Sequence, residues 1–332
     1  METLPECAPK VDGKAYLADL RKLVTRTEDD LRGRAQELED VHADLSAQYD
    51  EAVRSERTLE TFESWRDQYL TQVAVGWVLS CVFLRYLEDN DLIEEIWLAG
   101  EGERLQRAHD RHQLFFRTAP TLTDRDYLLE AFSQVAKLPG CGDLFGSEKN
   151  PLWLLGPSGD MAKEILLFFQ TVDPASGKLL RTFGDPASGR MAETRFLGDL
   201  YQDLSEAARK RYALLQTPDF VEEFILDRTL EPAIELFGID EVRMLDPTCG
   251  SGHFLLGGFG RLLERRQREK PGENERERVQ KALDGVYGVD LNPFAVAIAR
   301  FRLLVAALEA SGVKRMKNAP NFKIHVAAGD SL

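Results

Sequence analysis

Hydrophobic residues recur with helical spacing through the first part of the chain. The spacing predicts helix over 16–70 and again over 65–98. Leucines return at seven-residue steps in the first stretch, but the alternate seam of a coiled coil is poorly filled. We therefore expect a long amphipathic helix with a solvated acidic face. The leucines are Leu31, Leu38, Leu45 and Leu59, and the poor seam positions are Ala35, His42, Tyr49 and Glu56.

The longest apolar run lies inside the second helical stretch. It extends over 73–84, which is too short for a helix to cross a bilayer, since that takes about 20 residues. The run predicts a buried helix. Three tryptophans near it are expected in the core, namely Trp65, Trp77 and Trp97.

A five-residue segment occurs twice in the middle of the chain. Asp-Pro-Ala-Ser-Gly stands at 173–177 and again at 185–189. Each copy predicts a tight turn, because Asp, Pro, Ser and Gly all favour turns. The two copies could bracket a small hairpin around Leu179 to Phe183, in a segment that connects two domains.

Strands and helices alternate towards the C-terminus. The pattern predicts short strands at 242–245, 286–289 and 322–328. It predicts helices at 219–237, from about 253 and at 293–310. Strand–helix alternation of this kind implies a parallel sheet with right-handed crossovers.

Charge separates the two halves of the chain. Of 332 residues, 42 are basic and 56 acidic. The first 200 residues have a net charge of −13 and the remainder has −1. A strongly basic nucleic-acid module is excluded, and two regions with different roles are indicated.

The cysteines and the N-terminal residues indicate the cellular compartment of the protein. The four cysteines form no CxxC pair, and the N-terminus has no apolar signal-peptide core. Free thiols in a reducing cytoplasm are therefore expected.

The sharpest chemical signal is the sequence DPTCGSGHF at 246–254, which follows a predicted strand and opens a helix. Such a glycine-rich turn lets backbone N–H groups approach a ligand. A P-loop is rejected because Gly258 stands where its lysine should be. A dinucleotide fingerprint is rejected because Leu255 replaces its third glycine, and because the acidic residue Asp290 lies too far along the chain.

The same nine residues resemble motif I of the S-adenosylmethionine-dependent amino-methyltransferases, whose usual form is DPxxGSGxF. The segment 288–293, GVDLNP, resembles their motif II, and 328–331, AGDS, resembles motif III. The segment 215–220, LQTPDF, resembles motif X. Motif X before motif I is the order of the gamma class of adenine N6 DNA methyltransferases.

This resemblance implies S-adenosylmethionine as cofactor and assigns residues to it. Asp290 would accept the ribose hydroxyls, and Asp330 the adenine amino group. The other implied cofactor-binding residues are Thr217, Asp246, Thr248, Gly250 and Gly252. Thr217 also has an ordinary interpretation, as the N-cap of the helix that follows Pro218.

Neighbouring side chains favour structural interpretations. Cys249 has no base beside it in sequence and is expected to be a small packing residue, and His253 is expected to be structural. The basic side chains at 261–268 could touch DNA phosphate, but the interleaved glutamates favour a salt-bridged, solvated helix.

A wider resemblance narrows the family. Residues 196–205, FLGDLYQDLS, with 212–218, YALLQTP, are similar to the PglX family, the large methyltransferases of phage growth limitation (BREX type 2) defence systems. The implied fold class is α/β: a partial doubly wound, Rossmann-like methyltransferase domain at 196–332, preceded by a mainly helical region at 1–195. The implied partners are duplex DNA, for the complete protein, and other defence-system proteins; neither a metal nor a membrane is expected.

One element of the family is missing. In such enzymes the chemistry belongs to motif IV, [N/D/S]PP[Y/F], whose polar group and aromatic ring hold a flipped adenine. No such tetrapeptide occurs in these 332 residues, and Asn292-Pro293-Phe294 lacks the second proline. We therefore expect no catalytic residue and no methyltransferase activity in this chain alone.

Two alternatives remain open from the sequence. The chain could be a non-catalytic interaction module, whose acidic helical region binds a partner protein and whose half-domain is vestigial. It could also be a protein or small-molecule methyltransferase, although the Thr-Pro element and the long helical N-terminus argue against this.

Overall fold

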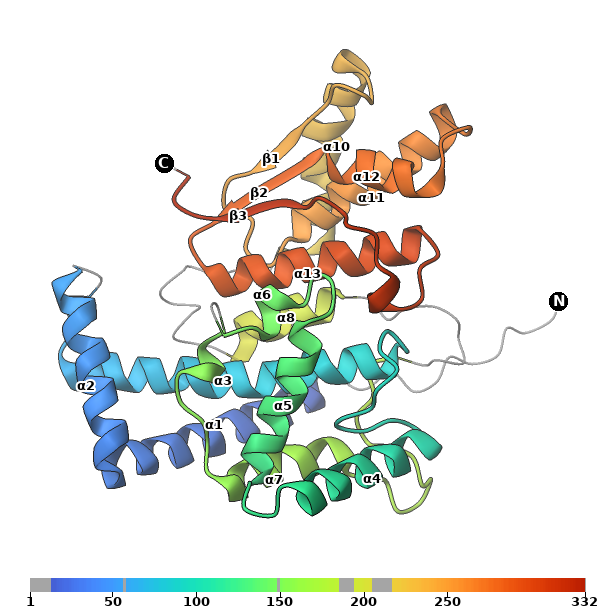
Figure 1. Cartoon of the computed structure of the whole chain (residues 1–332). Helices are drawn as coiled ribbons and strands as arrows, with labels where there is room; N and C mark the ends of the chain where they lie inside the picture. The colour runs from blue at the N-terminus through green and yellow to red at the C-terminus, as the bar shows by residue number, and fades with distance from the viewer. Residues whose placement is uncertain (1–12, 56–57, 148–149, 185–193, 205–216, 332) are drawn as a thin grey trace. The chain divides into compact units, whose positions relative to one another are not determined.

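The computed structural model describes residues 13–55, 58–147, 150–184, 194–204 and 217–331. The chain forms two compact units (Figure 1). The first unit contains residues 1–132 and 151–192, and the second contains 133–150 and 193–332. The segment 133–150 thus belongs with the C-terminal residues.

The first unit is built from helices. They are α1 (Gly13–Glu37), α2 (Glu39–Arg54), α3 (Phe62–Asp89), α4 (Glu103–Thr118), η1 (Pro151–Trp153) and α7 (Gly159–Gln170). A further helix, α5 (Asp124–Ala136), runs across the boundary with the second unit.

The single long helix expected over 16–70 is wrong. The chain leaves helical geometry at Leu38, where Glu39 and Asp40 begin α2, and acidic residues favour a helix N-terminus. It leaves it again before Thr61, whose hydroxyl accepts a hydrogen bond from the Ser64 N–H and caps α3. The leucine repeat breaks at the same places, since Leu38 and Leu59 are exposed while Leu31 and Leu45 are buried.

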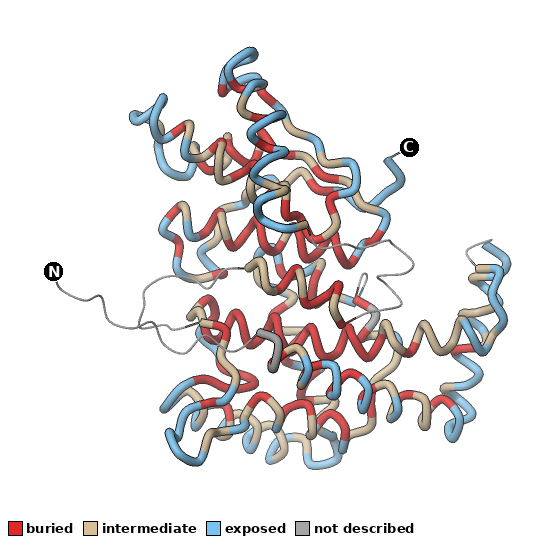
Figure 2. Tube along the Cα trace, turned by 180° about the vertical axis from the view of Figure 1, so that it is seen from behind, coloured by how far each residue is buried: buried red, intermediate tan, exposed pale blue. Residues whose placement is uncertain are grey.

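Helix α3 is the central element of the first unit. It ends at Asp89, short of the expected 98, and its residues from Val73 onwards are buried (Figure 2). Among the described residues it is the one helix long and apolar enough to cross a membrane, but 89% of its apolar window is buried inside the protein. The expected buried helix is confirmed. Trp77 and Trp97 lie in the core as predicted, whereas Trp65 is half-buried.

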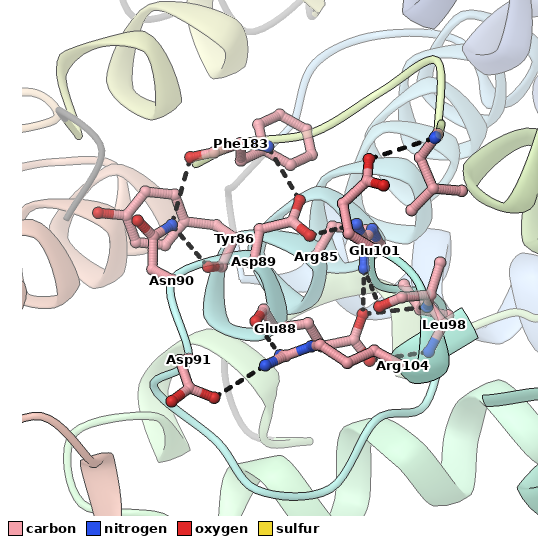
Figure 3. A network of polar contacts seen from close by, with 12 residues as sticks. Arg85, Tyr86, Glu88, Asp89, Asn90, Asp91, Leu98, Glu101, Arg104 and Phe183 are labelled. Carbon is pink, nitrogen blue, oxygen red and sulfur yellow. Dashed lines mark hydrogen bonds and ion pairs between the residues drawn. The ribbon is translucent and has the colours of Figure 1, made fainter. Parts of the chain in front are cut away.

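The C-terminal end of α3 holds a cluster of buried charges (Figure 3). The Arg85 guanidinium forms ion pairs with Glu88 and Asp89, and all three side chains are buried. Glu88 also accepts hydrogen bonds from the backbone N–H groups of Trp97, Leu98 and Ala99. The cluster therefore ties the segment after α3 to the end of the helix.

Asp89 extends this cluster to a distant part of the chain. Its Oδ2 accepts a hydrogen bond from the Phe183 N–H at 2.9 Å. Burial raises the pKa of this carboxyl to about 6, although the Arg85 charge opposes the shift. The folded state therefore holds the Asp89 proton more tightly than the unfolded chain does.

The raised pKa predicts a pH dependence of stability. Protonation of Asp89 in the folded state raises the free energy of unfolding by roughly 3 kcal/mol. This contribution is complete below about pH 4, and it is lost as the pH rises through about 6. Asp89→Asn should remove this component. Urea denaturation of both proteins at pH 4.5 and pH 7 measures it, and an unchanged pH dependence in the variant would contradict it.

The first copy of the repeated segment forms the expected turn. The Gly177 N–H donates to the Asp173 carbonyl, and Gly177 has a φ of +68°. Val172 and Leu179 face each other across this turn as an antiparallel bridge. The copy at 173–177 is thus itself the turn of a short hairpin, and the second copy lies outside the described residues.

The second unit contains a small parallel sheet and the helices that follow its strands. The strands are β1 (Met244–Asp246), β2 (Val286–Asp290) and β3 (His325–Ala328), paired in the order β1-β2-β3. The helices are α6 (Gly142–Phe145), α8 (Arg195–Leu204), α10 (Asp219–Phe237), α11 (His253–Glu269), α12 (Glu275–Leu283), α13 (Pro293–Ala310) and η3 (Met316–Asn318). The three predicted strands are present, although β1 begins two residues and β3 three residues later than expected. Helices α10, α11 and α13 are confirmed, with α10 and α13 at their predicted bounds.

The core of this unit lies on one face of the sheet. Val286 and Val326 point into a cluster formed with buried residues of α10, α11, α12 and α13. The side chains that alternate with them point to the other face, where Leu245 is 62% exposed and Tyr287 stacks on His325. In Figure 1 the strands lie side by side as gold to red arrows.

Candidate cofactor-binding site

Residues 246–252, from the last residue of β1 to the residue before α11, form what we call the glycine loop. Gly250 and Gly252 have φ values of +52° and +87°, which side chains with a Cβ rarely adopt. A methyl group built at Gly252 would also lie 3.0 Å from the Ala299 Cβ. Both glycines are therefore required by the shape of the loop, which begins where the Asp246 Oδ1 accepts a hydrogen bond from the Thr248 N–H at 3.1 Å.

Asp290, at the end of β2, anchors this loop. Its Oδ2 accepts a hydrogen bond from the Gly250 N–H at 2.8 Å, and its Oδ1 accepts one from the Asn292 N–H at 2.9 Å. The main chain adds a third bond, from the Cys249 N–H to the Val289 carbonyl. The end of β2 thereby fixes the conformation of the loop that follows β1.

The carboxyl ends of all three strands meet at this edge of the sheet. The register pairs Asp246 with Gly288 and Asp290 with Ala328. The Gly329 N–H donates to the Asp290 carbonyl at 2.9 Å, so exposed Asp330 follows directly at the same edge. The structure thus places three aspartates predicted from sequence, at 246, 290 and 330, at the ends of consecutive strands.

Electrostatics at this edge favour particular ligands. Burial raises the pKa of Asp246, the Thr248 N–H opposes the shift, and the Asp290 charge adds to it. Two neighbouring carboxylates repel phosphate but accept hydrogen bonds from hydroxyl and amino groups. The edge therefore suits a ligand that presents hydroxyl or amino groups better than one held by its phosphates.

Cys249 and His253 are both buried beside the loop. Burial first, and then the Asp246 and Asp290 charges, raise the pKa of the Cys249 thiol to about 12, so the group remains a protonated packing residue. The His253 ring is buried and its Nε2 lies 3.2 Å from Asp199 Oδ1. In the described part of the chain, Cys81, Cys141 and Cys249 are all free thiols.

Thr217 lies immediately before α10, but it is not the N-cap that sequence suggested. Pro218 occupies the N-cap position, and its carbonyl accepts hydrogen bonds from the Val221 and Glu222 N–H groups. The Thr217 carbonyl accepts a hydrogen bond from Arg195 Nη2 at 2.6 Å. Its preceding motif residues, Leu215 and Gln216, lie outside the described residues.

The side-chain amide of Asn292 is engaged in contacts within the protein. Its Oδ1 accepts hydrogen bonds from the Phe294 and Ala295 N–H groups, and so caps α13. Its Nδ2 donates to the Tyr201 hydroxyl at 2.6 Å. Asn-Pro before an apolar helix is a recognisable N-cap signal, whereas Tyr201 carried no signal of its own.

Three of the basic side chains of α11 are paired with acids. Arg261 contacts Asp227 and Glu231, Arg265 contacts Glu269, and the buried Arg266 contacts Asp240 and Glu273. The expected salt bridges are confirmed, but only Glu269 and Glu273 are acids of the interleaved stretch, and Arg266 is buried and not solvated. Among the described residues, no group of three or more His, Cys, Asp or Glu side chains could hold a metal ion.

Comparisons with known proteins agree with this arrangement. Residues 235–323 match the DNA-methyltransferase domain of MmeI. The chain is 49% identical over 328 residues to the adenine-specific methyltransferase PglX of Streptomyces coelicolor. This alignment covers 97% of the present chain and 27% of the Streptomyces protein. It is 35% identical over 103 residues to a putative type II restriction enzyme and methyltransferase of Methanocaldococcus jannaschii, covering 28% of this chain and 9% of that protein.

The chain spans about a quarter of the length of the Streptomyces relative. The similarity extends through both structural units, and the matched domain contains the glycine loop and Asp290. By sequence, the chain is therefore similar over nearly its whole length to an adenine-specific methyltransferase of the PglX type, and it includes a segment similar to a DNA-methyltransferase domain.

Proposed function

We propose that this chain supplies the S-adenosylmethionine-binding portion of a gamma-class adenine N6 DNA methyltransferase that acts in bacterial phage defence. One observation carries the proposal. Asp290 accepts a hydrogen bond from the Gly250 N–H and lies beside Asp246 where the carboxyl ends of the strands meet. In parallel α/β sheets, ligands bind at that edge.

The residues present fit this cofactor. The Asp290 carboxylate has lone pairs beyond its two backbone bonds, which suit the ribose hydroxyls, and Asp330 follows β3 where an adenine amine would be accepted. The proposed set is completed by Thr217, which precedes α10, and by Asp246, Thr248, Gly250 and Gly252 in the loop. When bound, the cofactor supplies an electrophilic methyl group, and these residues bind and orient it.

The proposal extends to the fold and the setting. The three parallel strands and their crossover helices would be half of a doubly wound, Rossmann-like sheet. Duplex DNA would be the substrate of the complete protein, which would work in the cytoplasm with other defence-system proteins. The chain alone would not transfer methyl groups, because its 332 residues contain no [N/D/S]PP[Y/F] sequence.

Calorimetric titration of the purified chain with S-adenosylmethionine tests the proposal. We expect saturable binding, with no incorporation of tritiated methyl groups into adenine-containing duplex DNA. ATP is the control ligand: it shares the adenosine but should bind weakly or not at all, because its phosphates would face Asp246 and Asp290. Absence of S-adenosylmethionine binding would contradict the proposal and favour an interaction module, and methyl transfer would contradict the predicted inactivity.

A further inference from the structure

Helix α8 contacts the N-terminal ends of all three helices around the glycine loop. At α10, Arg195 forms ion pairs with Asp219 and Glu222. At α11, Asp199 lies 3.2 Å from the ring of His253, the first residue of that helix. At α13, the Tyr201 hydroxyl accepts the hydrogen bond from Asn292, and its ring packs edge-on against Phe294. One short helix thus contacts three elements that are remote in sequence.

Gly198 brings α8 close to the loop itself. A methyl group built at this position would lie 2.5 Å from Arg302 Nη1 and 2.7 Å from Ser251 Oγ. Both of these side chains are almost completely buried, at 2% and 1% exposure, so they have little room to move aside. The absence of a side chain at 198 is therefore what allows this approach.

Arg302 connects α13 to the middle of the loop. Its Nη1 donates a hydrogen bond to the Ser251 carbonyl at 2.7 Å, between the two glycines with positive φ. Its Nε lies 3.5 Å from the Thr194 hydroxyl, which immediately precedes α8. Because the guanidinium is buried against Gly198, the position of α8 controls the position of this hydrogen bond.

We propose that α8 is the positioning element of the cofactor site, with Gly198, Tyr201 and Arg302 as its positioning residues. They act through the glycine loop and through the Asn292 cap. The inference rests on the proposed function, since it assigns α8 a part in binding the same cofactor. When the loop is already ordered, binding does not pay the entropic cost of ordering it. Losing the contacts of α8 would therefore lower the affinity for the cofactor.

Two glycine-to-alanine substitutions form a matched test. Gly198→Ala adds a methyl group against Arg302 and Ser251, whereas Gly260→Ala adds the same group to α11 with nothing within 4 Å. We expect Gly198→Ala to weaken S-adenosylmethionine binding by about tenfold or more, and Gly260→Ala to leave it unchanged. Deuterium exchange should rise in the loop peptide 246–254 of Gly198→Ala and stay constant in α12.

Tyr201→Phe provides a milder disturbance if Gly198→Ala does not fold. It removes only the hydroxyl that accepts from Asn292, and should raise exchange in 290–296 and weaken binding. Equal affinities of the two alanine variants, or exchange that rises equally in the loop and in α12, would overturn the positioning role. If the unmodified chain shows no binding, the proposed function fails, and this inference fails with it.

Discussion

Asp290→Ala is expected to lower the affinity for S-adenosylmethionine by about 100-fold or more. The substitution removes the carboxylate that is proposed to accept the ribose hydroxyls, and hydrogen bonds to charged groups are worth about 1.5–3 kcal/mol each. It also removes the acceptor of the Gly250 N–H, so the glycine loop loses its side-chain bond to β2 and keeps the main-chain bond from Cys249 to Val289. Calorimetric titration of the variant and the unmodified chain measures the loss.

Asp284→Ala is the matched control for this experiment. Asp284 precedes β2, whereas Asp290 ends it, and it contacts His325 and Gln280 away from the glycine loop. The same change at this end of the strand should leave the affinity within about twofold of the unmodified value, since surface contacts contribute little. Equal affinities of the two variants would contradict the assignment of Asp290.

Arg85→Met should strongly destabilise the first unit. It leaves Glu88 and Asp89 buried beside each other without their cation, and breaking a buried pair in this way costs about 3–5 kcal/mol. All four tryptophans of the chain lie in the first unit, at 65, 77, 97 and 153. Urea denaturation followed by tryptophan fluorescence therefore reports on this unit.

Arg54→Met is the control for Arg85→Met, because it breaks an ion pair that is exposed to solvent. Arg54 and Glu51 have the same three-residue separation on a helix, but their side chains are 72% and 54% exposed. Exposed pairs contribute at most about 1 kcal/mol. Similar shifts of the denaturation midpoint in the two variants would show that the buried cluster does not support the first unit as we infer.

Sequence reasoning was accurate where local signals determine an element. Helix α13 begins at Pro293 after the Asn292 cap, and its bounds followed from that signal and from its apolar length. Helix 16–70 was mispredicted because the leucine spacing persists across two breaks. At these breaks the acids after Leu38 and the Thr61 cap start new helices. Periodicity records which residues share a face, but not whether the helix continues.

The candidate site divides in the same way. The glycine loop and Asp290 could be recognised from their position after predicted strands. The contacts of α8 could not, because Tyr201–Asn292 and Gly198–Arg302 join residues about 90 to 100 positions apart. Such pairs become visible only when the fold is known.

The one-sided packing of the sheet has a consequence for the order in which this unit can assemble. Strands that are neighbours in the sheet are also consecutive in the chain, and their crossover helices share one core. Each strand can therefore dock as it is synthesised, without waiting for a distant segment. Parallel sheets are normally covered on both faces, and the face with Leu245 is open in this unit. Any further layer would then dock on a surface that has already formed.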